Sequence, residues 1–339
     1  WWLHHSLVSL NKSLEGTLSV FEGDPLPILL QLIAENEVSS ISWNRCYEPW
    51  RIDRDTVIKK TLQEFGINVT TFNSSLLWEP WEVVKGDGSS YKVFTPFFNK
   101  GCANAPIPRL PIKKPEFYNL SKKCFSNNKI DDLNLLPHSN WHEKLNSCWA
   151  IGEGNAQKCL SSFLEKKIKK YKNDRNFPSR MNVSQLSPHI HFGEISPNQI
   201  WHSVYSENCS IDEKAFCSEL GWREFSYHLL FYNRSLSKNN LQKKFDKFPW
   251  SGDRVKLTLW EQGQTGIPFV DAGMRELWNT GYMHNRVRMV VASFLVKNLQ
   301  IHWVHGARWF WDCLVDADLS SNSASWQWVA GSGADAAPY

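Results

Sequence analysis

The stretch that decides the fold is SSISWNRCYEPWRIDRDTVIKKTLQEFGINVTTFN, which spans residues 39–73. Residues 39–44 and 67–73 have the composition of short strands, and the segment between them, residues 48–66, has helical spacing and ends at a glycine. A strand, a helix and a second strand in this order predict a parallel pair, because parallel strands need a long crossover that a helix usually supplies. We therefore expect a parallel sheet with helices on its faces in the first part of the chain.

The residues before this stretch continue the alternation. TLSVFEG, residues 17–23, is predicted to form another short strand, and residues 25–38 are predicted to form a helix that Asp24 caps. Pro25 fits the first position of that helix, since a proline there gives up no hydrogen bond. No G-x-G-x-x-G motif follows a predicted strand, so the dinucleotide fingerprint that often accompanies such a sheet is absent from this sequence.

The second half of the sequence has a helical pattern. Between about residues 96 and 140 the chain is rich in proline and turn residues, which indicates a linker. In NAQKCLSSFLEKKIKKY, residues 155–171, apolar residues recur at spacings of three and four residues. They form one face of a predicted helix, and the opposite face is rich in lysine. Further predicted helices, several of them apolar around much of their circumference, cover residues 217–232, 270–280 and 285–300. We expect these helices to lie deep in a bundle.

The chain is thus predicted to have three parts. They are an α/β domain with a Rossmann-like parallel sheet at residues 1–100, an interdomain linker at residues 101–150, and an all-helical domain at residues 151–339. The sequence begins WWLHHSLVSL, without methionine and inside a predicted helix, and it ends just after a glycine turn. We expect the chain to be a fragment that lacks both ends of a longer protein.

The composition is that of a packed globular protein, with 42% hydrophobic and 21% charged residues. No apolar run reaches the roughly 18 residues that a membrane span needs, and no basic and apolar leader opens the sequence. The eight cysteines form no C-x-x-C pair, which favours free thiols in a reducing compartment over a zinc site. We expect a cytoplasmic protein, associated with the nucleoid if it is bacterial, and a monomer.

Two weaker signals concern metal and nucleic acid. His189 and His191 form an HIH triplet that could bind a metal, but no matching cysteine or carboxylate motif accompanies it, and a structural role is favoured. The net charge is +4, and the whole excess lies after residue 150, because residues 1–150 hold 16 basic and 16 acidic residues. Such a mild excess does not by itself establish a nucleic-acid partner.

Polar and charged side chains lie within or beside several of the apolar helices. They are Glu219, Asn285, Arg286, Arg288, Asp316 and Asp318. A buried charge needs a partner, so the simplest interpretation is that Arg288 pairs with one of the aspartates and holds two helices together. Tryptophans stand close to these residues, and the chain has 18 of them. Besides packing, an indole can stack on a base or a flavin, or lose one electron.

Four long motifs place these residues in a family. LSPHIHFGEISP (residues 186–197), ELGWREF (219–225), TGIPFVDAGMRELWNTGYMHNRVRM (265–289) and DADLSSNSASWQWVAGSGADAAPY (316–339) together resemble the photolyase/cryptochrome family. The likeness is greatest to the class I cyclobutane pyrimidine dimer photolyases, and it extends into the first half through WWLHHSL and WNRCYEPWRIDRD. It implies an α/β antenna domain, truncated at its start, followed by an all-α FAD-binding domain, truncated at its end.

The resemblance implies that the helical domain holds FAD. In the family a Thr-Ser-Arg-Leu-Ser turn contributes to the cofactor site, and here valine and glutamine replace its threonine and arginine. The implied cofactor residues are Tyr171, Val183, Ser184, Gln185, Leu186, Ser187, Phe216, Arg223, Arg288, Asp316, Ala317, Asp318 and Asn322. A second, antenna chromophore (a folate, a deazaflavin or a flavin) occurs in the family, and this sequence does not identify one.

The resemblance also implies roles for the remaining polar and aromatic residues. Trp326, Trp303 and Trp260 match the family's electron-transfer chain, in that order from the flavin outward to solvent. Glu219 matches the acid that hydrogen-bonds the lesion, while Trp222 and Trp328 match the walls against which the lesion stacks. Asn285 lines the same pocket, and Arg175 and Arg286 are candidates for phosphate contacts.

The activity that the resemblance implies is light-driven DNA repair, a carbon–carbon lyase reaction. Excited, reduced FAD would donate an electron to a cyclobutane pyrimidine dimer, the ring would split, and the electron would return. The expected partner is ultraviolet-damaged DNA, single- or double-stranded, with no metal and no membrane. A cryptochrome-type blue-light photoreceptor without repair activity is the main alternative, and Glu219, Trp222, Asn285 and Asn322 together count against it.

Two further alternatives are a flavin-free helical module that binds nucleic acid and a six-four photolyase. A yellow purified protein would exclude the first. The motif YMHNRVR lacks the second histidine that six-four photolyases place near the lesion, which counts against the other.

Overall fold

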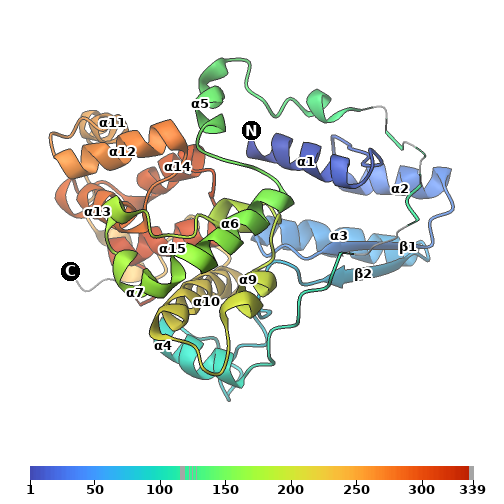
Figure 1. Cartoon of the computed structure of the whole chain (residues 1–339), viewed down its shortest axis with the longest axis horizontal. Helices are drawn as coiled ribbons and strands as arrows, with labels where there is room; N and C mark the ends of the chain where they lie inside the picture. Colours follow the sequence, from blue (N-terminus) through green and yellow to red (C-terminus); the bar gives the residue numbers. More distant parts are fainter. Residues whose placement is uncertain (115–118, 122, 124, 127, 336–339) are drawn as a thin grey trace.

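The structure is a computed structural model that describes residues 1–114, 119–121, 123, 125–126 and 128–335. It has a small α/β part followed by a larger helical part, the order that the sequence predicts (Figure 1). None of the helices that these residues form is long and apolar enough to cross a membrane.

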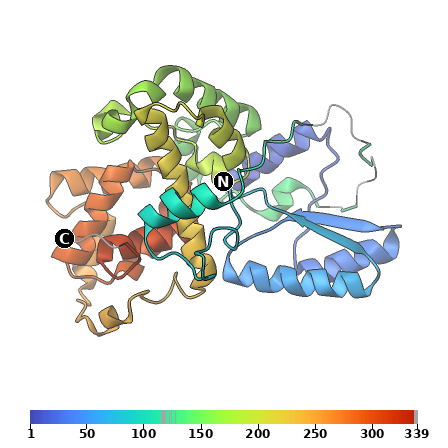
Figure 2. The ribbon, with the colours of Figure 1, turned by 90° about the horizontal axis from the view of Figure 1, so that it is seen from below.

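The α/β part forms as predicted around residues 39–73. Strands β1 (Ser40–Asn44) and β2 (Asn68–Phe72) pair in parallel, with Ser40 opposite Asn68, and helix α3 (Pro49–Glu64) is the crossover between them. Helix α2 (Pro25–Glu35) begins at Asp24, whose side chain accepts a hydrogen bond from the Leu26 amide at 3.1 Å. Apolar residues of both helices pack with the strands in one cluster, and Figure 2 shows the four elements together.

The strand predicted at residues 17–23 is absent, and this prediction was wrong. The Thr17 amide donates to the Leu14 carbonyl at 3.1 Å, and the Leu18 amide donates to the Asn11 side chain at 3.2 Å. These donors are therefore used by the end of helix α1 (Trp2–Ser13), and among the described residues no strand pairs with this segment.

The predicted linker begins with helical turns rather than with irregular chain. Helix α4 (Phe94–Pro96) continues into a π-helical turn, η1 (Phe97–Cys102). Phe94, Phe97 and Cys102 are buried in the largest apolar core, together with residues of the helical part. Aromatic residues in this stretch therefore override its turn-rich composition. Part of the predicted linker, at residues 115–118, 122, 124 and 127, lies outside the described residues.

The remaining elements follow in chain order: η2 (Ile130–Leu133), η3 (Asn140–His142), α5 (Glu143–Asn146), α6 (Glu153–Lys166), η4 (Ile168–Lys170), α7 (Tyr171–Asp174), η5 (Pro178–Arg180), α8 (Ser187–His191), α9 (Pro197–Val204), α10 (Ile211–Tyr232), η6 (Lys243–Lys247), α11 (Arg254–Glu261), α12 (Pro268–Thr280), α13 (Asn285–Ser293), η7 (Phe294–Asn298), α14 (Trp303–Cys313) and α15 (Leu319–Ala330). All four helices predicted in this half are present, although the first ends at Lys166 and the last gives way to a π-helical turn at Phe294.

Local sequence signals fix where the two central helices begin. Ser210 and Glu213 form a reciprocal capping box at the start of α10, with hydrogen bonds of 3.2 and 2.7 Å. The Asp318 carboxylate caps α15 by accepting from the Ser321 amide at 2.8 Å. Helix α15 packs against both α10 and α14, so that it joins the two large apolar clusters of the helical part.

The approach of α15 to α14 depends on a glycine. A Cβ atom at Gly306 of α14 would lie 2.1 Å from the Cη2 atom of Trp326 and 2.7 Å from a methyl group of Leu295. Trp326 is almost fully buried, so it has no room to withdraw. The absence of a side chain at residue 306 therefore allows the Trp326 indole to lie between the two helices.

We expect Gly306→Ala to lower the free energy of unfolding by about 1–3 kcal/mol, the usual cost of overpacking a core. Chemical denaturation monitored by circular dichroism measures this change. Gly154→Ala, in α6, is the matched control, because open space surrounds that position and alanine is favoured in a helix by up to about 1 kcal/mol. Equal stability of the two variants would contradict the packing argument.

Candidate functional site

The helical part contains two adjoining cavities. The larger has a volume of about 540 Å³ and is lined mainly by α10, α13, α15 and the turn at residues 316–318. The smaller, of about 250 Å³, is lined by Tyr171, Phe216 and the turn at residues 183–187. Arg175, Ser187, Glu219, Arg223, Tyr282, Asn285 and Ser321 are among the residues that line both. The shared residues make the two cavities parts of one elongated site.

The structure brings nearly all of the predicted site residues to these two cavities. Every residue predicted to bind the cofactor or DNA lines one or both of them, and so do Glu219 and Trp326. Trp260 and Trp303 line neither. Residues far apart in the sequence thus meet in one place, on helices that the sequence motifs predicted separately.

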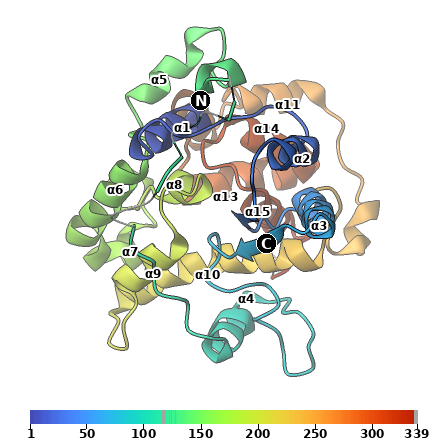
Figure 3. The ribbon, with the colours of Figure 1, turned by 90° about the vertical axis from the view of Figure 1, so that its right-hand side faces the viewer.

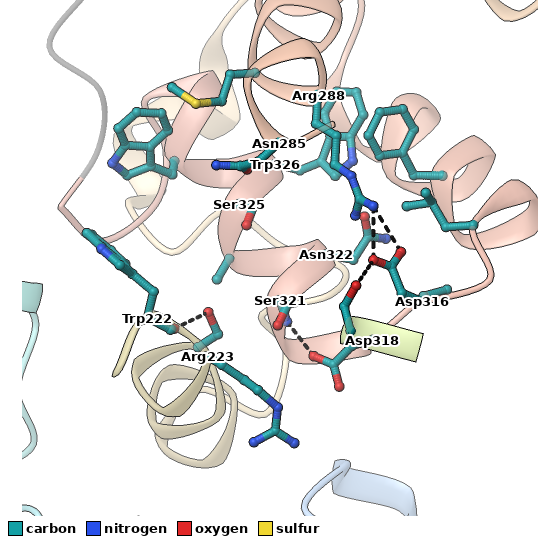
Figure 4. A pocket seen from close by; sticks show the side chains of 18 of the residues that line it. Trp222, Arg223, Asn285, Arg288, Asp316, Asp318, Ser321, Asn322, Ser325 and Trp326 are labelled. Carbon is teal, nitrogen blue, oxygen red and sulfur yellow. Dashed lines mark hydrogen bonds and ion pairs between the residues drawn. The ribbon is translucent and has the colours of Figure 1, made fainter. Parts of the chain in front are cut away.

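The predicted pairing of Arg288 with an aspartate is confirmed. An Nη atom of Arg288 lies 3.2 and 2.9 Å from the two carboxylate oxygens of Asp316, and its Nε donates to the Met283 carbonyl at 2.7 Å (Figure 4). The Ser187 hydroxyl donates to the same carboxylate at 2.7 Å. This pair joins α13 to the turn before α15, and it places a fully partnered ion pair in the wall of the larger cavity.

Asp318, two residues later, is held as a carboxylate. Its oxygens accept hydrogen bonds from the Ser321 amide, the Ser320 hydroxyl at 2.5 Å and the Tyr227 hydroxyl at 2.5 Å. Burial acts to raise the pKa of Asp318, but the charge of Arg223 and these hydrogen bonds outweigh burial and lower the pKa. Asp318 therefore carries a negative charge within the protein.

Arg223 has partners on two sides. Its guanidinium lies 3.0 Å from Glu224 and over the ring of Tyr227, 4.8 Å from the ring centre. Glu224 also accepts hydrogen bonds from the backbone amides of Leu77 and Trp78, at 2.8 and 3.3 Å. Burial raises the pKa of Glu224 to about 7, although Arg223 and both amides favour its charged form. Arg223 is thus fixed between the cavity and the segment that follows β2.

The rim of the larger cavity carries more positive than negative charge. An Nη atom of Arg175 lies 2.7 Å from the Glu219 carboxylate. Arg286 donates from two nitrogens to the Asn176 side-chain oxygen, at 2.9 and 2.6 Å. Burial and the nearby charge of Arg175 lower the pKa of Arg286, which shows that the two guanidinium groups repel each other. Two arginines and one carboxylate can therefore attract an anion to this rim.

The predicted order of the three tryptophans is wrong. Trp260 was expected nearest to solvent, but it has no exposed surface and its ring lies 6.1 Å from that of Trp326, centre to centre. Trp303 also has no exposed surface, and its indole nitrogen donates to Asn240 at 2.8 Å. The order came from a resemblance of sequence motifs, and such a resemblance does not report how deeply each residue is buried.

Sequence analysis overlooked an aromatic residue next to Trp303. Trp250 is half-buried, and its ring lies 5.1 Å from that of His302, which precedes Trp303 in the chain. It stands in the short motif FPW, between predicted helices, so no periodic pattern singled it out.

Tyr282 and two serines of α15 are further cavity residues that sequence analysis missed. Tyr282 lines both cavities, and the Arg288 guanidinium lies 5.3 Å from its ring centre. Ser321 and Ser325 line the larger cavity from one face of α15. The sequence did contain a signal for the two serines. Small polar residues spaced four apart on an apolar helix lie on one face, and that face is not expected to pack in the apolar core.

The HIH triplet is divided between two environments. His189 is buried, and its Nδ1 lies 2.5 Å from Glu194, which also accepts from the Trp2 indole at 3.3 Å and the Gly152 amide at 3.0 Å. His191 instead lines the larger cavity, 4.0 Å from Asp318. Within the described residues, no group of three or more histidine, cysteine or carboxylate side chains is placed to hold a metal.

Comparison with known proteins agrees with this geometry. The model of the FAD binding domain of DNA photolyase matches residues 216–339, and the DNA photolyase model matches residues 1–116. Deoxyribodipyrimidine photo-lyase of Agrobacterium fabrum is 42% identical over 346 residues, which cover 100% of this chain and 72% of that protein. Cryptochrome-1 of Arabidopsis thaliana is 36% identical over 98% of this chain and 51% of its own length.

A solved structure is similar over the same range. The crystal structure of a bacterial class III photolyase from Agrobacterium tumefaciens superimposes with a TM-score of 0.95 at 42% identity, covering 100% of this chain and 72% of that one. The chain thus spans about half of the cryptochrome and somewhat over two thirds of the photolyase.

We expect Tyr227→Phe to lower the free energy of unfolding at pH 7 by about 1.5–3 kcal/mol, the range for a hydrogen bond to a charged group. Asp318 has a lowered pKa, so its contribution to stability is present above its unfolded pKa and is lost as pH falls through the folded value. The difference between parent and variant should therefore shrink towards acid pH. Urea denaturation at several pH values measures it.

Tyr232→Phe is the control on the same helix, because its hydroxyl reaches only the Pro80 carbonyl, at 3.4 Å. A difference between Tyr227→Phe and the parent that stayed constant down to strongly acid pH would show that the hydroxyl does not act through the Asp318 charge.

Proposed function

This chain belongs to the DNA photolyase and cryptochrome family, and from that premise we propose that the protein is a light-driven DNA repair enzyme that splits cyclobutane pyrimidine dimers. One observation carries the proposal: a single site combines a polar, ion-paired wall with aromatic walls and a positively charged rim. We further propose that the protein acts as a cytoplasmic monomer and that its macromolecular partner is ultraviolet-damaged DNA.

The chain carries the family's FAD-binding domain, and the residues present fit that cofactor. The larger cavity has a volume in the range of known ligand sites, and the turn at residues 183–187 lines the smaller one beside it, with Gln185 in a left-handed conformation at φ 57°. Tyr171, Phe216 and this turn would hold one end of the cofactor, and Arg223, Arg288 and Asp316 the other. When bound, FAD supplies blue-light absorption and one-electron chemistry that side chains lack.

Asn322 supports repair over signalling. Its amide nitrogen donates to the Ala307 carbonyl at 2.9 Å, and the side chain lines the larger cavity, to which Oδ1 can offer an acceptor. An amide oxygen accepts a hydrogen bond and carries no charge. Asn322 would therefore accept a hydrogen bond from a protonated ring nitrogen without adding charge beside a reduced flavin.

The aromatic walls and the rim support DNA as the substrate. Trp222 and Trp328 line the larger cavity, where their rings would enclose a displaced pyrimidine dimer, while Glu219 and Asn285 offer hydrogen bonds to it. Arg286 stands at the rim, where it would bind backbone phosphate. Photolyases act on nucleotides taken out of the duplex, and a damaged base costs less to displace because its stacking is already impaired.

A blue-light photoreceptor is the second candidate, and the likeness to Cryptochrome-1 is the observation that favours it. Glu219, Trp222 and Asn285 in one cavity support repair instead, because a photoreceptor needs no groups to bind a lesion. A blue-light assay on an oligonucleotide with one thymine dimer decides between the two. Loss of the dimer under light, and none in darkness, is the result expected for a photolyase.

We expect Glu219→Ala to weaken binding of the dimer by about 1–3 kcal/mol, the cost of leaving a hydrogen-bonding group of the lesion without a partner. The flavin content should not change. Fluorescence anisotropy with the dimer oligonucleotide measures the binding. Asp174→Ala is the control, because Asp174 also pairs with an arginine, Arg180, but lines neither cavity. Parent-level repair by Glu219→Ala would assign Glu219 a structural role.

We expect Trp326→Phe to abolish light-driven reduction of oxidised FAD, because phenylalanine keeps the packing of the ring but resists one-electron oxidation. Repair by chemically reduced protein should continue. Absorption spectra recorded under blue light with an external reductant measure the reduction of FAD. The dimer assay measures repair by the chemically reduced protein. Trp201→Phe is the control, a buried indole that lines neither cavity. Normal photoreduction in Trp326→Phe would point to another electron donor.

A further inference from the structure

Trp222 lies at the end of a pile of three aromatic rings. Its indole is stacked on the ring of Phe94, with the ring centres 3.7 Å apart and the planes 10° from parallel. Phe94 is in turn stacked with Phe98, at 5.5 Å and 11°. Figures 1 and 3 show α4, which contains Phe94, alongside α10, which contains Trp222. Segments more than a hundred residues apart thus meet ring on ring.

As seen from the larger cavity, the rings of Phe94 and Phe98 lie behind Trp222. Trp222 lines that cavity, whereas Phe94 and Phe98 do not. One face of the indole is covered by Phe94, so only the other face and the ring edge are available to the cavity. Phe94 therefore contacts the indole directly, and Phe98 contacts Phe94, while neither phenylalanine lines the cavity.

Further contacts hold the rings behind Trp222 in place. A Cβ atom at Gly221 would lie 2.4 Å from the Cδ2 atom of Phe98, so the glycine beside Trp222 leaves the space that Phe98 fills. The Phe94 amide donates to the Asp335 carboxylate at 3.2 Å. The rings of Phe94 and Phe225 pack edge to face, with their centres 6.0 Å apart. Phe94 itself is only 8% exposed.

We propose that Phe94, supported by Phe98, is a positioning residue that fixes the plane of the Trp222 indole so that one face is presented to a pyrimidine pair displaced from DNA. This inference rests on the proposed repair function and names a residue that acts on the substrate only through Trp222. An indole with one face against a rigid stack loses little side-chain freedom when a base stacks on its other face. Gly221 is needed in this arrangement, because a side chain at that position would occupy the space that the Phe98 ring fills.

The test compares Phe94→Ala with Phe94→Tyr in the flavin-loaded protein. Dissociation constants are measured for an oligonucleotide with one thymine dimer and for the same sequence undamaged. Phe94→Ala should bind the dimer about five- to tenfold more weakly, part of the range that stacking on an aromatic ring provides, with unchanged affinity for undamaged DNA. Phe94→Tyr keeps the aromatic ring and should therefore bind the dimer with the parent affinity. Such a result would assign the weaker binding of Phe94→Ala to the loss of the stacked ring.

Two further variants complete the design. Gly221→Ala should also weaken dimer binding, because the added methyl group displaces Phe98, and it decides the matter if Phe94→Ala fails to fold. Phe231→Ala is the control, since Phe231 lies on the same helix as Trp222 and contacts the rings of Trp81 and Tyr232 but lines neither cavity. Flavin absorbance and melting temperature establish that each variant is folded and loaded.

The outcomes separate this inference from the function on which it rests. A parent protein that binds dimer and undamaged DNA equally would overturn the repair function and the positioning role together. A parent that prefers the dimer, with Phe94→Ala or Gly221→Ala keeping the same preference, would overturn the positioning role alone. Weaker dimer binding in both variants, and not in Phe231→Ala, supports it.

Discussion

Two buried carboxylates stand at the start of α15, and their charges must be offset before that helix can lie in the core. Asp316 is offset by Arg288 of α13, and Asp318 by hydrogen bonds from Tyr227 of α10 and from the first turn of α15. The requirement to pair these two charges therefore sets how α10, α13 and α15 meet. The larger cavity lies between these three helices, and its polar wall is made of the same residues.

Small residues let the helices come close enough for that pairing. Gly306 admits the Trp326 indole between α14 and α15, and Ser320 and Ser323 of α15 are fully or almost fully buried. The same helix keeps Ser321 and Ser325 towards the cavity. One face of α15 thus packs and the other lines a site, which explains why its apolar and polar residues do not separate into a simple stripe.

The α/β part contributes to the site without lining it. The backbone amides of Leu77 and Trp78 bind Glu224, which holds Arg223 at the cavity, and the segment after them supplies Phe94 behind Trp222. Both contacts act on residues of α10, and neither Leu77, Trp78 nor Phe94 lines the cavity. The geometry of the site is therefore shared between the two parts of the fold, although the cavity residues come from the helical part alone.

Sequence alone predicted the parallel strand pair, the helices of the second half and many of the residues that line the two cavities, because these depend on local periodicity and on long motifs such as residues 265–289 and 316–339. Local patterns failed where the partner was distant. Residues 17–23 have the composition of a strand but bond to α1, and residues 94–102 have the composition of a linker but join the core through their aromatic rings.

Depth and contact were decided only by the tertiary structure. Nothing in the order of the chain shows that Trp260 is buried against Trp326, or that Trp250 lies further out. Nor does it show that Phe94 covers one face of Trp222. Periodicity reports which face of a helix is apolar, whereas the distance of a ring from solvent and the identity of its neighbour depend on how all the helices pack together.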